Sequence, residues 1–325
     1  MKSLRLLSVA LLACTLPLAT ACSQSAESQA VDDTADSLIN GRVAPASALG
    51  SGVLLWVNQA GSQCTAVRVG PRHLLTAAHC VVANLPSTKM GTQLLPGFVA
   101  GSPIWYTRAP AVALNDTSSF SAAFVQSTIL APGFALSCAL AGCSVSDLYT
   151  LSIADMALVT LDRDVEGNVA TAFVDTQPLR DGDQVTLSGY GCIDGSWALP
   201  PIREFRFGVS KTLSPSAASS GAQPIFPINP LLFGNTYALT PGASFGGSSS
   251  SGTPAICPGD SGGPLYRGTP QPGMPDRVVG INSGILFDSA QIATVNYHTR
   301  IENGIGGFSP MVMWLKTLLP ASSFL

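Results

Sequence analysis

Short apolar segments separated by turn-forming residues dominate the chain after Ser37. Seven of them, bounded by Gly, Pro, Ser or Asp, are rich in the β-branched and aromatic residues typical of strands: VLLWV, CTAVRV, MALVTL, QVTLSGYG, EFRFGVS, RVVGINSG and IATVNYHTRI. Helical spacing of apolar residues occurs only in MVMWLKTLL, Met311–Leu319. The pattern predicts an all-β chain, built as antiparallel barrels or a sandwich, that ends in a short helix at about 311–319.

Two long stretches interrupt this rhythm. One runs from Val82 to about Asp147, and the other, rich in Ser, Gly and Pro, runs from Ser214 to Thr253. Long connections of this kind usually lie on the surface of a scaffold. We therefore expect both stretches to be surface insertions.

The N-terminus has the pattern of an export signal. Positive residues precede an apolar run, Leu6 to Ala19, that is too short to span a bilayer. Small residues before Cys22 fit a cleavage site, so residues 1–21 are predicted to be a signal peptide. They also resemble a bacterial lipobox, which would make Cys22 a lipidation candidate; lipid anchoring and plain secretion both fit. Residues 22–37 are polar and aperiodic, as in a flexible tether or propeptide.

Composition narrows the class of protein. Of 325 residues, 46% are hydrophobic and 11% charged, which is typical of a globular chain, and the net charge of −3 gives no sign of a nucleic-acid surface. Without Cys14 of the signal peptide and a lipidated Cys22, six cysteines remain, which in an oxidising compartment favours three disulfides. A zinc site is the weaker alternative, because the chain has three histidines and no CxxC pair.

The segment CPGDSGGP, Cys257–Pro264, is the first candidate for chemistry. Its residues are all common in turns, so Ser261 becomes a candidate nucleophile only if the chain also supplies a base and an acid. His79 in TAAHC is the candidate base, because a disulfide between Cys64 and Cys80 could hold its loop. Asp155 is the candidate acid, since a carboxylate in the apolar run around it is costly without a partner.

TAAHC, then DMAL, then GDSGGP resemble, in this order, the chymotrypsin/trypsin-type serine proteases. The resemblance covers nearly all of Leu38 to Leu325 and includes LINGRVA, SGYG, VVGINSG and YHTRI. It implies two antiparallel six-stranded β-barrels, at about 38–178 and about 179–310, within a protease domain of residues 38–325.

The resemblance also implies roles for individual residues. Ser261 would be the nucleophile, His79 the general base and then acid, and Asp155 the group that orients His79. The N–H groups of Gly259 and Ser261 would form the oxyanion hole. Neither a cofactor nor a metal is implied.

Further implied roles concern activation and substrate binding. Cleavage of the Ser37–Leu38 bond would free an amine on Leu38 that pairs with Asp260, as in the family's zymogens. Ser283 and Gly284 would offer backbone groups to an extended polypeptide substrate.

The chain departs from the family in its spacings. The gap between His79 and Asp155 is longer than usual, so Asp147 and Asp162 are kept as alternative acids. The usual cysteine partner of Cys257 is missing, and Cys192 lies in the loop that neighbours the nucleophile loop in this family's fold. The expected disulfides are Cys64–Cys80, Cys192–Cys257 and Cys138–Cys143.

The residues of the specificity pocket differ from those of trypsin. Ala255 stands where trypsin-like members have an Asp, with Ile256 after it, so cleavage after Arg or Lys is not expected. Asn296 replaces a glycine of the opposite wall, and Ile285 narrows the entrance, which favours small or medium apolar side chains. His298 lies in the same region, so a substrate with a polar or acidic side chain at the cleaved position is kept as an alternative.

These observations predict an exported bacterial serine endopeptidase, secreted or lipid-anchored, that acts on polypeptides and is activated by another protease. A non-catalytic binding module on the same fold is the alternative. An α/β-hydrolase esterase is disfavoured, because it needs a G-x-S-x-G elbow and the order Ser, Asp, His.

Overall fold

The computed structural model describes residues 38–44, 50–56, 63–83, 93–113, 115–134, 153–167, 169–192, 200–221, 236–243, 252–271, 273–287, 293–302 and 309–325. The predicted signal peptide, the tether with Cys22, the Cys138–Cys143 pair and Asp147 lie outside these residues. No helix in the described part is both long and apolar enough to cross a membrane.

Six strands close the first barrel, in the order β2-β3-β4-β8-β7-β5. They are β2 (Gly52–Trp56), β3 (Gln63–Gly70), β4 (His73–Thr76), β5 (Pro103–Thr107), β7 (Ser121–Leu130) and β8 (Ala157–Leu161). Apolar side chains of these strands, such as Val67, Leu75 and Val159, are fully buried. Closure leaves no free edge, which for short strands removes the risk of pairing with another chain.

An eight-stranded sheet forms the second half, in the order β1-β12-β10-β14-β15-β16-β13 with β9 parallel to β15. The strands are β1 (Arg42–Val43), β9 (Phe173–Val174), β10 (Gln184–Gly189), β12 (Arg206–Lys211), β13 (Tyr237–Pro241), β14 (Pro264–Arg267), β15 (Arg277–Phe287) and β16 (Ala293–Arg300). An isolated antiparallel bridge joins Leu213, just after β12, to Leu239 on β13. The predicted all-β, chymotrypsin-like fold is confirmed: one six-stranded barrel is closed, and the second sheet, with eight strands rather than the predicted six, forms a half-barrel.

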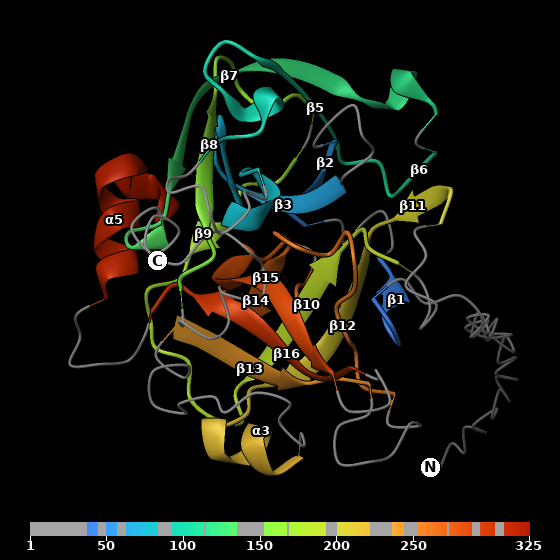
Figure 1. The fold of residues 1–325 in the computed structure, drawn as a ribbon, viewed down its shortest axis with the longest axis vertical. Helices are drawn as coiled ribbons and strands as arrows, with labels where there is room; N and C mark the ends of the chain where they lie inside the picture. Colours follow the sequence, from blue (N-terminus) through green and yellow to red (C-terminus); the bar gives the residue numbers. More distant parts are fainter. Residues whose placement is uncertain are drawn as a thin grey trace, which may run out of the picture. The chain divides into compact units, whose positions relative to one another are not determined.

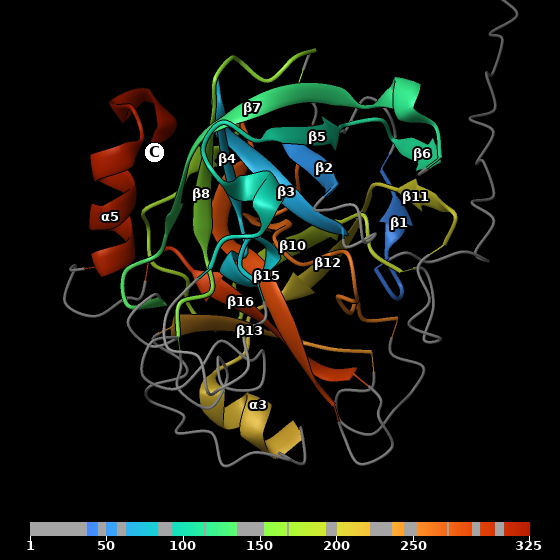
Figure 2. The same cartoon turned by 45° about the horizontal axis from the view of Figure 1, so that its top comes forward.

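The remaining elements are short. β6 (Ala111–Ala113) pairs with β11 (Ile202–Glu204), and the 3-10 turns are η2 (Ala78–Cys80), η3 (Pro96–Phe98), η4 (Thr117–Ser119) and η6 (Ala321–Ser323). The α-helices are α3 (Pro215–Gly221), which was not predicted, and α5 (Pro310–Leu318). Ser309 caps α5 by accepting from Val312 N–H. The buried residues of α5, Met311 and Leu315, belong to the same apolar cluster as the first barrel, and the helix lies on the side of β8 (Figures 1 and 2).

The prediction of two surface insertions is wrong. The stretch Val82–Asp147 contains β5 and β7, two walls of the first barrel, and Ser214–Thr253 contains β13 of the second sheet. The physical reason is visible in β7, whose inward positions include the small Ala123 while Phe124 points outward with 47% of its surface exposed. A strand whose small residues point inward does not present the apolar alternation that sequence analysis relies on.

Candidate active site

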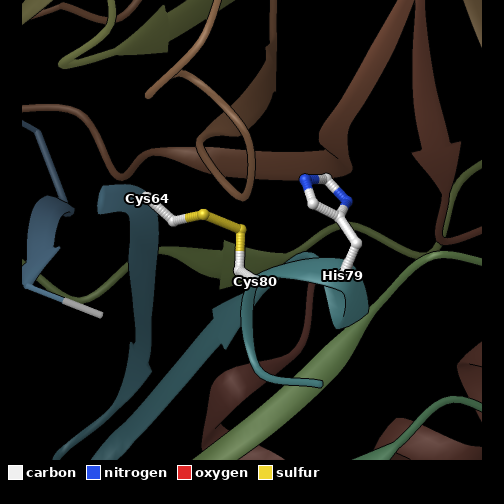
Figure 3. Close-up of side chains that lie close together, drawn as sticks. All are labelled: Cys64, His79 and Cys80. Atoms are coloured by element: carbon white, nitrogen blue, oxygen red, sulfur yellow. A yellow bond between two sulfur atoms is a disulfide. The ribbon is translucent and has the colours of Figure 1, made fainter. Parts of the chain in front are cut away.

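His79 lies on η2, the turn that directly follows β4. The disulfide between Cys64 on β3 and Cys80 is present, as predicted, and fixes this turn next to the barrel wall. Figure 3 shows His79 and Cys80 on the same segment, with the disulfide reaching from Cys80 to Cys64 on a neighbouring strand. One ring nitrogen and the two sulfur atoms lie within 4.8 Å of one another, but both sulfurs are used in the disulfide, so this group does not offer a set of metal ligands.

Asp155 is fully buried just before β8, and its carboxylate faces His79. Oδ2 lies 2.6 Å from His79 Nδ1, and Oδ1 accepts the His79 backbone N–H at 2.9 Å. Oδ2 also accepts from Ser283 Oγ at 2.7 Å. The alternative Asp162 lies at the surface, where it accepts from Phe124 N–H and pairs with Arg163.

The protonation states of this pair follow from its surroundings. Burial acts to raise the pKa of Asp155, but the charge and hydrogen bond of His79 outweigh it, and the net pKa is lowered. For His79, burial acts to lower the pKa, and the charge of Asp155 outweighs it, so the net pKa is raised. With Nδ1–H directed at a carboxylate, the neutral ring carries its free lone pair on Nε2.

The glycines around Ser261 are required by close approach of the backbone. Gly262 has φ of 81°, and a Cβ there would lie 2.1 Å from Thr76 Oγ1. A Cβ on Gly263 would lie 2.2 Å from the carbonyl oxygen of Ser188. The run of glycines therefore lets the loop fit against both barrels, and the simple interpretation of a surface turn does not account for it.

Thr65 on β3 holds this loop against the first barrel. Its N–H donates to the carbonyl of Ser261 at 2.8 Å, and its Oγ1 donates to the carbonyl of Gly259 at 2.8 Å. Cys80 Sγ also lies 3.8 Å from the carbonyl oxygen of Ser261. The segment that carries His79 and the loop that carries Ser261 are thus in contact, and Thr65 is a site residue that the sequence did not reveal.

Two amide groups of the loop make no hydrogen bond with the described residues. The carbonyls of Pro258, Gly259, Asp260 and Ser261 all accept hydrogen bonds. Within the described residues, the N–H groups of Gly259 and Ser261 have no acceptor. Gly259 has φ of 96°, a conformation that favours glycine, so its amide direction depends on that residue type.

Asp260 is fully buried beneath the loop. Its carboxylate accepts from Gly191 N–H at 2.7 Å and Cys257 N–H at 2.9 Å. Gly189 and Gly191 of the SGYG motif make room for it, since a Cβ on either would lie within 2.5 Å of its oxygens. Burial raises the pKa of Asp260 to about 7, and the charge of Arg203 lowers it only in part. Asp260 is therefore a buried acid that lacks a full counter-charge.

Leu38 is fully buried and has φ of 53°, which is unusual for a residue with a side chain. The next residue, Ile39, forms an antiparallel bridge with Ala255, and Asn40 Nδ2 donates to the carbonyl of Thr253 at 3.0 Å. The segment that resembles the family's mature N-terminus therefore lies along the predicted pocket wall while still joined to Ser37.

The predicted pocket residues are brought together, but Asn296 is not available to a ligand. Ala255, Ile256 and Asn296 are all buried. Asn296 Oδ1 accepts from Ile256 N–H at 3.0 Å, and Nδ2 donates to Thr240 Oγ1 and to the carbonyls of Pro241 and Pro254. Ser283 and the half-buried Gly284 lie on β15, and the Ser283 hydroxyl donates a hydrogen bond to Asp155.

The disulfide Cys192–Cys257, which joins the SGYG segment to the loop that carries Ser261, is also present as predicted. Two disulfides in a trypsin-like fold indicate an extracellular protein. Residues 139–304 match the sequence model of the trypsin family, a match that includes Asp155 and Ser261 and begins after His79. The chain was also compared with curated proteins, and none of them matches. Because the family match spans just over half of the chain, the chain belongs to the trypsin family, whose general activity is that of a serine peptidase acting on polypeptides.

Proposed function

We propose that the chain is an exported serine endopeptidase in which Ser261, His79 and Asp155 form the catalytic triad. The observation that carries this proposal is the fully buried Asp155 carboxylate, 2.6 Å from Nδ1 of His79. Burying a carboxylate is costly. A buried carboxylate beside an imidazole fits a catalytic role, because it stabilises the charged form of a base that gains and loses a proton. Asp155 is preferred to Asp162, because Asp162 lies at the surface.

In the proposed mechanism, Ser261 Oγ attacks the scissile carbonyl carbon while its proton passes to Nε2 of His79. The carbonyl oxygen becomes an oxyanion that accepts from the N–H groups of Gly259 and Ser261, each worth roughly 3 kcal/mol in the transition state. His79 then gives its proton to the leaving amine, which leaves an acyl group on Ser261. Water then attacks the acyl carbon and loses a proton to His79. His79 returns that proton to Ser261 Oγ as the ester bond breaks, which releases the acid and restores the free enzyme.

The pocket favours small or medium apolar side chains. Its wall at Ala255 and Ile256 carries no charge. The Asn296 amide is hydrogen-bonded to the backbone of Ile256 and Pro254 in this wall, so it is not available to the substrate. A buried, uncompensated Arg or Lys would cost several kcal/mol there. Backbone groups of Ser283 and Gly284 would pair with the substrate strand.

Cleavage of the Ser37–Leu38 bond is proposed to activate the enzyme. Asp260 is buried with an incomplete counter-charge, and the new amine of Leu38 would supply a cation. The segment that follows this bond already lies along Ala255. If Cys22 carries a lipid, the same cleavage would release the domain from a bacterial envelope.

Labelling with a fluorophosphonate probe, followed by peptide mapping, tests the proposal. We expect label on Ser261 and none in Ser261→Ala or His79→Ala, with unchanged melting temperatures. A folded protein beginning at Leu38 that takes no label and cleaves no peptide would instead support the alternative, a non-catalytic binding module on the same fold.

A further inference from the structure

A buried row of polar side chains runs beneath the pocket wall toward the nucleophile loop. Its members, Asn296, Thr240, His298 and Asn282, are each 0% exposed. Successive distances are 3.0 Å from Asn296 Nδ2 to Thr240 Oγ1, 3.1 Å from Thr240 Oγ1 to His298 Nε2, and 2.8 Å from His298 Nδ1 to Asn282 Oδ1. We refer to these four side chains as the buried relay.

The two ends of the buried relay are backbone groups of the candidate site. At one end, Asn296 Oδ1 accepts from Ile256 N–H in the pocket wall. At the other end, Asn282 Nδ2 donates to the carbonyl of Ser188 at 2.9 Å and to the carbonyl of Asp260 at 3.2 Å. The relay therefore joins the pocket wall to the residue that precedes Ser261.

The direction of every bond in the relay is fixed by its ends. Because Asn282 donates to two carbonyls, its Oδ1 must accept, so His298 carries its proton on Nδ1. Burial lowers the pKa of His298 to about 3, so the ring is neutral and Nε2 accepts from the Thr240 hydroxyl. Thr240 in turn accepts from Asn296. One arrangement of donors and acceptors satisfies all four side chains, and an apolar side chain at any of the four positions would break it.

The relay ends on the peptide group that supplies an oxyanion-hole donor. The carbonyl of Asp260 and the N–H of Ser261 belong to one planar trans peptide, so they point in opposite directions. Two donors hold this carbonyl, Asn282 Nδ2 and Gly263 N–H at 2.9 Å. Fixing the carbonyl therefore fixes the direction of the Ser261 N–H.

We propose that Asn282 and His298 are positioning residues that aim the Ser261 N–H into the oxyanion hole and tie it to the pocket wall. This inference rests on the proposed peptidase activity. Neither side chain touches substrate; Asn282 acts through the Asp260 carbonyl, and His298 acts by presenting Nδ1–H to Asn282. A donor that is misdirected in the transition state lowers turnover without weakening ground-state binding.

The test compares Asn282→Leu, His298→Leu and His298→Gln in the protein beginning at Leu38, with concentrations set by titration of active sites. Leu removes the polar link at similar volume, whereas Gln can donate to Asn282 and accept from Thr240. We expect the Leu variants to lose about 10²-fold in kcat with KM changed less than about threefold, and Gln to recover most of the loss. Thr186→Val is the control, since Thr186 is equally buried but donates to Gly268 on another part of the sheet.

Inhibitor binding separates positioning from general damage. A peptidyl trifluoromethyl ketone with alanine at the cleaved position forms an oxyanion on Ser261, and the corresponding alcohol cannot. We expect the Leu variants to bind the ketone about 10²-fold more weakly and the alcohol as the parent does. If Leu variants fail to fold, Thr240→Val, which removes the middle link at equal volume, gives the same comparison with a smaller loss.

Two results would overturn the inference: full kcat in the folded variants, or equal weakening of ketone and alcohol. Failure of the proposed function is distinct, because then the parent itself would take no fluorophosphonate label.

Discussion

Ser283 Oγ donates to Oδ2 of Asp155 at 2.7 Å, the same oxygen that lies 2.6 Å from Nδ1 of His79. Asp155 is held through its other oxygen by the backbone N–H of His79, and its own carbonyl accepts from Thr299 Oγ1 at 3.0 Å. The carboxylate is therefore fixed from both barrels, since His79 follows β4 and Ser283 lies on β15. Ser283 thus contributes a side chain to the candidate site in addition to the backbone groups expected from the sequence.

Replacing Ser283 by alanine tests this contact. The loss of one hydrogen bond to a buried charge should lower kcat by about tenfold, because the imidazole is less well oriented, and leave KM unchanged. Steady-state kinetics on a peptide substrate provide the measurement. Ser127→Ala, a half-buried serine on β7, is the matched control and should keep full activity. An unchanged kcat in Ser283→Ala would contradict the role.

Asp155→Asn should lower kcat by about 10⁴-fold, because the amide favours the wrong tautomer of His79. The charge of Asp155 raises the pKa of His79, and the base must be neutral to act. Activity is therefore lost as the pH falls through this pKa, and removing the charge should move that acid limb of the pH–rate profile to lower pH. Asp162→Asn, at the surface, should change neither quantity. An active Asp155→Asn enzyme together with an inactive Asp147→Asn enzyme would reverse the assignment of the acid.

Removing the Cys64–Cys80 disulfide by a double alanine substitution should cost roughly 3 kcal/mol of unfolding free energy, given its sequence separation of 16 residues. Denaturant unfolding of the parent and of the double variant gives this value.

Non-reducing peptide mapping of the parent protein checks the remaining expected pair, Cys138–Cys143. Finding either of these two cysteines free in active enzyme would rule that pair out.

Profiling of cleavage sites in a peptide library tests the pocket. Alanine and residues of similar size should be enriched at the cleaved position, because Ala255 and Ile256 provide an uncharged wall that Asn296 closes. Arg and Lys should be depleted, since the described residues of this wall include no carboxylate. Strong cleavage after either basic residue would contradict the proposed specificity.

Local motifs made much of the site predictable from the sequence. TAAHC and GDSGGP carry short-range constraints, a disulfide beside His79 and glycines that only a close backbone approach requires, and such constraints are readable along the chain. Most strand segments were likewise found where β-branched residues alternate or run together, as in β3 and β8.

What the sequence did not reveal depends on contacts between distant segments. β5 and β7 were missed because Trp105 and Phe124 point outward, with 43% and 47% of their surfaces exposed, while small residues such as Ala123 point inward. Asn296 was expected to line the pocket, yet it hydrogen-bonds to Thr240, 56 residues away. A polar residue on a strand does not indicate which distant partner will satisfy it.

The substitution Asp260→Asn should have opposite effects on stability in the uncleaved chain and in the form that begins at Leu38. In the uncleaved chain its pKa is raised by burial to about 7, above that of the unfolded chain. The folded state therefore holds this proton more tightly, and stability falls as the pH rises from about 4 to about 7. Asp260→Asn should abolish this fall and stabilise the uncleaved chain at pH 8.

In the form beginning at Leu38, the new amine would pair with the carboxylate, and removing one partner of a buried pair costs roughly 3–5 kcal/mol. There, Asp260→Asn should destabilise the protein at pH 8 and lower its activity. Denaturant unfolding of both forms in a Ser261→Ala background, which prevents self-cleavage, measures stability, and the parent background measures activity. The same effect of Asp260→Asn in both forms, or full activity in a chain that still begins at Ser23, would refute activation by the Leu38 amine.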